Sequence, residues 1–98
     1  MQLNKEEEPL LPEFSGTCTL TTDVRYILYT ENNWEAVQVF CRPFTIEHSK
    51  IKAAEGRAVI DLPTGNETVE YGMVLIRLGN KRILVFTPRE FMDLFSIK

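Results

Sequence analysis

The chain has 98 residues, with 11 basic and 14 acidic side chains, a net charge of -3 and 44% hydrophobic residues. A chain of this length supports a single core, and no apolar run approaches the roughly 20 residues that a membrane-spanning helix needs, which argues against a membrane partner. The N-terminus shows no charged region followed by an apolar stretch, so we expect a cytoplasmic protein.

The charges are unevenly distributed along the chain. Residues 1–13 hold one lysine against four glutamates, a net charge of -3, so residues 14–98 carry ten charges of each sign. This pattern predicts a flexible acidic arm at 1–13 and a single small β-rich domain at 14–98. A neutral body makes nucleic acid an unlikely partner, because affinity for phosphates needs excess positive charge. It also removes the repulsion that keeps copies of a small domain apart.

The arm contains one candidate partner-binding motif. Leu10 and Leu11 lie between Pro9 and Pro12, a spacing compatible with an extended docking segment. A solvated tail without a partner explains the same residues, and short patterns of this kind recur by chance. Both interpretations stay open at this point.

Residues 17–21 alternate and residues 24–29 are rich in β-branched and aromatic side chains, which predicts extended strands. Asn32 and Asn33 suit a two-residue turn that would pair Leu28 with Val37 and Tyr26 with Val39. A helix that begins after Asn33, with Trp34, Val37 and Cys41 on one stripe, is the alternative. We favour the strand, because residues 37–40 are largely β-prone.

Residues 46–55 are the least certain segment. Thr45 suits a helix cap, the two alanines favour helix and Gly56 would end it, so a second helix at 46–55 is possible. A hairpin turn at Glu55 and Gly56 is almost equally compatible. Residues 59–62 then form a short predicted strand, which the turn-prone residues 63–66 end.

The last third of the chain predicts a hairpin. Residues 73–78 and 81–86 are apolar and β-prone, and Gly79-Asn80 between them suits a two-residue turn. That turn places Arg77 opposite Arg82 and Leu78 opposite Lys81. Both faces of the hairpin are apolar and both require burial.

A C-terminal helix at 88–96 follows directly. Thr87 and Glu90 form a capping box around Pro88, and Phe91, Leu94 and Phe95 share one stripe. The predicted fold is therefore mainly β (α+β): an antiparallel meander or small barrel-like sheet of about five to six strands with this short helix.

Catalysis has little support in the sequence. The single histidine, His48, has no predicted neighbour that would orient it toward Cys18 or Cys41, so a Cys/His enzyme is the least favoured function. Both thiols lie in apolar, strand-like contexts and are expected to be free and buried. Zinc-ligand spacing and a glycine-rich phosphate loop are absent, so we expect no enzyme and no cofactor.

The favoured function is a non-catalytic protein-interaction or assembly module that forms a homodimer. A small regulatory or nucleic-acid-associated β domain is the alternative, in which the basic end of the hairpin meets an acidic partner. The candidate partner-binding residues are Arg77, Lys81, Arg82, Trp34, Leu10 and Leu11. Five aromatic residues are the expected interface anchors: Phe14, Tyr26, Trp34, Phe40 and Phe44.

Overall fold

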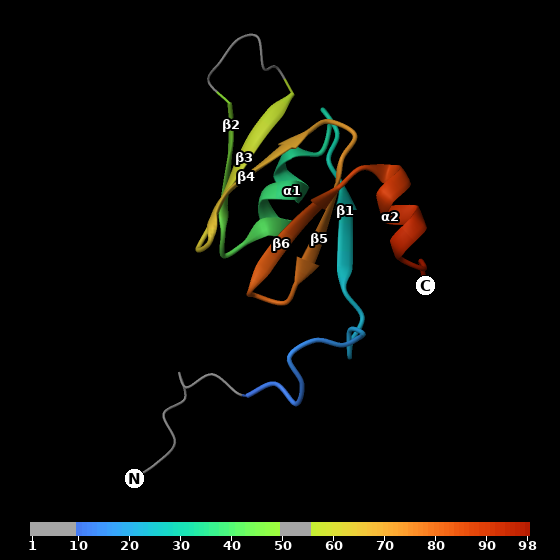
Figure 1. The fold of residues 1–98 in the computed structure, drawn as a ribbon. Coiled ribbons are helices and arrows are strands. Elements are labelled where there is room, and N and C mark those ends of the chain that lie inside the picture. The colour runs from blue at the N-terminus through green and yellow to red at the C-terminus, as the bar shows by residue number, and fades with distance from the viewer. Residues whose placement is uncertain (1–9, 50–55) are drawn as a thin grey trace.

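A computed structural model describes residues 10–49 and 56–98, and its elements follow one another around two sheets (Figure 1). In chain order the elements are β1 (Arg25–Leu28), α1 (Trp34–Cys41), β2 (Thr45–His48), β3 (Arg57–Leu62), β4 (Gly65–Glu70), β5 (Val74–Leu78), β6 (Arg82–Phe86) and α2 (Pro88–Leu94). The strands form two three-stranded antiparallel sheets, ordered β1-β5-β6 and β2-β3-β4. The prediction of a mainly β, α+β fold is confirmed.

The β2-β3-β4 sheet contains one confirmed strand and one that the sequence did not reveal. The predicted strand at 59–62 is part of β3, and the chain turns after it so that Leu62 lies opposite Gly65. The unpredicted strand is β4, whose side chains are exposed apart from that of Val69. A strand this polar lacks the apolar alternation by which strands are recognised.

The possible helix at 46–55 is not present at its N-terminal end. Thr45–His48 is a strand that pairs with β3, with Thr45 opposite Asp61 and His48 opposite Ala58. Only Ile46 is buried in it, in keeping with the two-residue period of a strand. The remainder of that prediction, at 50–55, lies outside the described residues.

The preference for a strand between residues 34 and 41 is wrong, because this segment is α1. The side chain of Asn33 forms two hydrogen bonds to preceding residues. Its Oδ1 accepts from the Thr30 amide at 2.9 Å, and its Nδ2 donates to the Leu28 carbonyl at 2.7 Å. These bonds close a loop after β1 in place of a hairpin. Strand β1 pairs with β5 instead, and α1 buries Val37 and Cys41.

The alternating residues 17–21 form no strand. Leu20 and Cys18 are exposed, so this stretch has no buried face that would fix a strand pairing. The expectation of two buried thiols is therefore wrong for Cys18 and confirmed for Cys41.

The predicted register of the last hairpin is wrong by one residue. The observed turn contains Gly79, Asn80 and Lys81, and it places Leu78 opposite Arg82 and Arg77 opposite Ile83. A shift of one residue moves every side chain of β6 to the other face of the sheet. Ile83 therefore enters the core between the sheets, where the two-residue turn would have placed Leu84.

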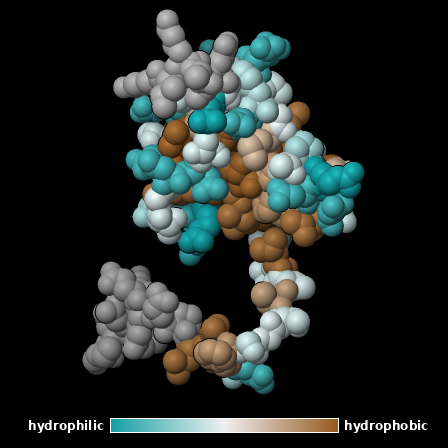
Figure 2. Space-filling view, turned by 45° about the horizontal axis from the view of Figure 1, so that its top comes forward, coloured by the Kyte–Doolittle hydropathy of each residue, from teal (hydrophilic) through white to brown (hydrophobic). Residues whose placement is uncertain are grey.

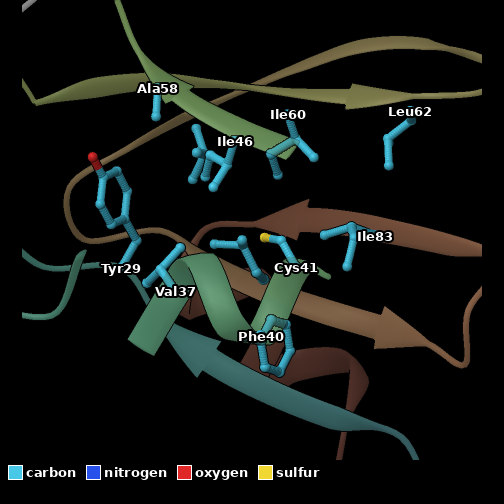
Figure 3. Close-up of a cluster of buried hydrophobic side chains, with 11 residues drawn as sticks. Tyr29, Val37, Phe40, Cys41, Ile46, Ala58, Ile60, Leu62 and Ile83 are labelled. Carbon is cyan, nitrogen blue, oxygen red and sulfur yellow. The ribbon is translucent and has the colours of Figure 1, made fainter. Parts of the chain in front are cut away.

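The prediction that both faces of this hairpin are buried is confirmed by two hydrophobic clusters. The inner cluster lies between the two sheets and α1 (Figure 3), and it contains Tyr29, Val37, Phe40, Cys41, Ile46, Ala58, Ile60, Leu62, Val69, Leu75 and Ile83. The outer cluster lies under α2 and consists of Val74, Ile76 and Phe91, with Phe95 and other half-buried residues packed against it.

Helix α2 begins as predicted and ends earlier than predicted. It stops at Leu94, and Phe95 follows as its C-cap in extended conformation. Phe91 and Phe95 stack with ring centroids 5.3 Å apart, as the predicted stripe requires. Leu94 is exposed, however, and so does not belong to that stripe.

The capping box of α2 supplies a first testable prediction. The Glu90 amide donates to Thr87 Oγ1 at 3.2 Å, and the Thr87 amide donates to Glu90 Oε1 at 2.8 Å. We expect Thr87→Ala to lower the free energy of unfolding by about 1 kcal/mol, and Thr87→Ser to restore most of it, since serine caps equally well. Urea denaturation measures both. Equal stability of the alanine variant and the wild type would contradict the role of the cap.

Candidate functional site

An open groove of about 500 Å³ lies on the described part of the chain. Such a volume lies within the range of about 300 to 1,000 Å³ that is usual for ligand-binding clefts. The groove runs between the segment that leads into β1 and the C-terminal part of the chain. Its lining comprises Leu20, Thr22, Asp23, Val24, Arg25, Tyr26, Ile76, Phe91, Phe95, Ser96, Ile97 and Lys98.

Local sequence explains how the main walls of the groove are held. The capping box fixes the start of α2, and Phe91 then anchors the helix on Val74 and Ile76. Strand β1 pairs with β5, which places Tyr26 opposite Ile76 and its ring centroid 4.8 Å from that of Phe91. The floor of the groove is therefore a packed hydrophobic surface.

The edges of the groove remain hydrophobic and exposed. Leu20, Tyr26 and Ile97 line it and are 60%, 47% and 53% exposed. Figure 2 shows hydrophobic residues gathered over one face of the folded part and again along the N-terminal segment. Contiguous exposed apolar surface of this kind is typical of interaction sites.

Two of the charged residues that line the groove are paired with each other. Lys98 Nζ forms an ion pair with Asp23 Oδ2 at 3.1 Å. Arg25 also lines the groove, but its guanidinium lies 5.8 Å from the centre of the Phe40 ring, which belongs to the inner cluster. The Arg25 charge is therefore on the α1 side of β1, since neighbouring residues of a strand point to opposite faces and Tyr26 packs on Phe91.

The three predicted basic residues of the hairpin do not act as one cluster. Arg77 is half-buried and donates to the carbonyl oxygen of Phe40, at the end of α1, and to Asn80 Oδ1 at 2.5 Å. It therefore satisfies a carbonyl that a helix end leaves without an intrahelical partner. Lys81 and Arg82 are exposed at the end of the hairpin, where Arg82 lies opposite Leu78.

The other predicted site residues are spread over the molecule. Trp34 is half-buried and stacks on His48, with ring centroids 3.7 Å apart and an interplanar angle of 22°. Leu10 and Leu11 are exposed on the N-terminal segment. The structure thus brings Lys81 and Arg82 together and leaves Trp34 and the two leucines on separate surfaces.

The five expected anchor residues differ in exposure. Phe40 is 6% exposed and belongs to the inner cluster, so it is not available to a partner. Trp34 and Phe44 are half-buried, whereas Tyr26 and Phe14 are exposed. Sequence reasoning missed the groove itself, because its walls come from residues 20–26 and 91–98, which only tertiary packing brings together.

A second hollow, of about 530 Å³, lies beside α1 and the start of β2. Its lining includes Glu35, Gln38, Arg42 and Glu47, so it is more polar than the groove. Within residues 10–49 and 56–98, no group of three or more His, Cys, Asp or Glu side chains has a metal-binding arrangement.

Burial controls the chemistry of Cys41. Desolvation raises the pKa of its thiol from 9.0 to about 11, although the positive charge of Arg77 opposes the shift. Since only the thiolate is reactive, a buried thiol with a raised pKa is inert. The exposed Cys18 has no such protection.

This difference predicts both reactivity and alkaline stability. At pH 8 a thiol reagent should label Cys18 quickly, and Cys41 only after unfolding. Between pH 9 and about 11 the folded state keeps the Cys41 proton that the unfolded state releases, so the free energy of unfolding should fall as the pH rises. Denaturation at several pH values measures the slope, and Cys41→Ala should reduce it. Rapid labelling of both thiols in the native protein would contradict the burial of Cys41.

Comparisons of the chain with protein-family models, with curated proteins and with solved structures found no match. Among the described residues, no helix has the length and apolar character needed to cross a bilayer.

Proposed function

We propose that this chain is a non-catalytic protein-interaction module that self-associates through the groove between β1 and α2. One observation carries the proposal: a cleft of about 500 Å³ has a packed hydrophobic floor and large apolar side chains exposed along its edges. Burial of apolar area is the dominant favourable contribution to most protein association. The sequence suggests that this module forms a homodimer in the cytoplasm.

The charge distribution supports self-association. Residues 14–98 carry ten positive and ten negative side chains, so no net repulsion separates two copies of the folded part. A symmetric dimer would use the same groove twice, which doubles the apolar area buried by one copy. Such an interface needs no bound metal or cofactor.

The two alternative functions have weaker support. For a nucleic-acid-associated domain, Arg77 is occupied by the Phe40 carbonyl and Asn80, which leaves Lys81 and Arg82 at the hairpin end. For a Cys/His enzyme, His48 stacks on Trp34, and burial raises the pKa of Cys41. A nucleophilic site would require an activated thiolate within hydrogen-bond reach of the histidine.

Sedimentation velocity of the full chain across the micromolar range tests the proposal. We expect a reversible dimer that persists at high salt, because an apolar interface is not screened. Ile97→Asp places a charge in the groove and should weaken the dimer roughly tenfold or more, since an unpaired interfacial charge is costly.

The matched control is Val39→Asp on α1. Val39 is 55% exposed and Ile97 is 53% exposed, and Val39 lines the second hollow. The same change there should leave the dimer intact. Equal weakening by both variants, or a monomer throughout the concentration range, would refute association through the groove.

A further inference from the structure

The N-terminal segment at residues 10–14 displays apolar side chains that nothing covers. Leu10, Leu11 and Phe14 are 96%, 78% and 102% exposed. Figure 1 shows this segment extending away from the sheets and from α2. Three large apolar side chains within five residues, all in solvent, are typical of a segment that binds elsewhere.

The segment does not occupy the groove of its own chain. Leu20, the first lining residue, follows Phe14 by six positions, so the tether would supply a millimolar local concentration if it could span the distance. In the structure none of residues 10–14 lines the groove. The groove is therefore open to the segment of another molecule.

The segment and the groove match in polarity. Leu10, Leu11 and Phe14 are the apolar side chains of the segment, and the floor of the groove is built from Tyr26 and Phe91. Asp23, the acidic residue that lines the groove, is already paired with Lys98. An apolar segment thus meets a groove with an apolar floor.

Strand β1 adds a backbone surface to this match. The sheet order β1-β5-β6 places β1 at an edge, and Arg25 and Tyr26 of this strand line the groove. An edge strand presents backbone N–H and C=O groups that an extended segment can bond. Side-chain pockets and main-chain partners are therefore available in the same place.

We infer that residues 10–14 of a second copy occupy the groove, and that two chains exchange these segments in a symmetric dimer. The inference rests on the proposed function and specifies what the groove binds. Exchange gives two identical contacts, each between the segment of one chain and the groove of the other. Exposure of the segment in one isolated chain is the expected unbound state.

Complementation between two full-length variants tests the exchange. The segment variant carries Leu10→Ser, Leu11→Ser and Phe14→Ser, which retain the charge, and the groove variant carries Ile97→Asp. At a concentration at which the wild type is dimeric and the weakened variants are not, each variant should be monomeric alone, because it lacks one half of every contact. An equimolar mixture should form a heterodimer with one intact contact, detected by sedimentation velocity as a species that neither variant forms alone.

Three other outcomes separate this inference from the proposed function. Self-association of the segment variant at wild-type strength would overturn the exchange and leave a dimer in which grooves contact each other. Association of the segment variant alongside a monomeric wild type would mean that the segment covers its own groove, which also overturns the exchange. A monomeric wild type with monomeric variants would remove the proposed function itself.

Discussion

Replacing Phe91 with alanine is expected to lower the free energy of unfolding by about 3 to 5 kcal/mol. The Phe91 side chain is 5% exposed and packs in the outer cluster with Val74 and Ile76. Helix α2 has seven residues, too few to persist in water without such packing. Urea denaturation, monitored by circular dichroism at a concentration below that of association, measures the loss.

Leu94→Ala is the matched control in the same helix. Leu94 is 66% exposed, so its truncation should change stability by no more than about 0.5 kcal/mol. If the two variants lose equal stability, α2 does not pack on the sheet through Phe91. The groove would then lack the wall that this helix provides.

Replacing Gly56 with alanine is expected to destabilise the fold through two separate effects. Gly56 has φ +85°, a conformation that costs an L-residue roughly 1 to 2 kcal/mol. A Cβ there would lie 2.6 Å from Cδ2 of Tyr71, so the Tyr71 ring or the backbone must move. Overpacking of this kind adds typically about 1 to 3 kcal/mol.

Gly72→Ala separates the two effects. Gly72 has φ +91°, close to that of Gly56, and a Cβ at this position meets nothing within 4 Å. It should therefore show the backbone cost alone, and thermal or urea denaturation of both variants gives the difference. Equal destabilisation would show that Tyr71 does not pack against Gly56.

The sequence predicted correctly the feature that neighbouring residues determine, and it failed for the feature that depends on contacts between distant parts of the chain. The start of α2 is determined by Thr87, Pro88 and Glu90, which contact only each other, and its prediction is confirmed. The register of the preceding hairpin depends on which face of β6 is buried against distant elements. Arg77, for example, reaches a carbonyl on α1, and no local pattern in the hairpin indicates that contact.

In helix α1 the strand propensity of the residues is outweighed by the hydrogen bonds of the preceding loop. Val37, Val39 and Phe40 favour a strand by propensity, but Asn33 bonds to Leu28 and Thr30 and closes a loop from which the helix begins. Burial of Val37, Phe40 and Cys41 in the inner cluster then stabilises the helical face. The periodicity of this face was visible in the sequence, whereas the role of Asn33 required the structure.

The candidate site was less predictable than the fold. The sequence identified Leu10, Leu11 and Phe14 as residues available to a partner, but their proposed binding surface is formed by the two distant segments 20–26 and 91–98. The basic end of the hairpin was a candidate binding site because a two-residue turn would place Arg77 directly opposite Arg82. The observed three-residue turn removes that opposition.

Amide NMR spectra of the ¹⁵N-labelled full chain, recorded over a series of dilutions, test the groove as the interaction surface most directly. We expect concentration-dependent shifts for Val24, Tyr26 and Ile97, which line the groove, and none for Gln38 and Glu47, which line the second hollow. Shifts confined to the second hollow, or spectra that do not change with concentration, would contradict this expectation.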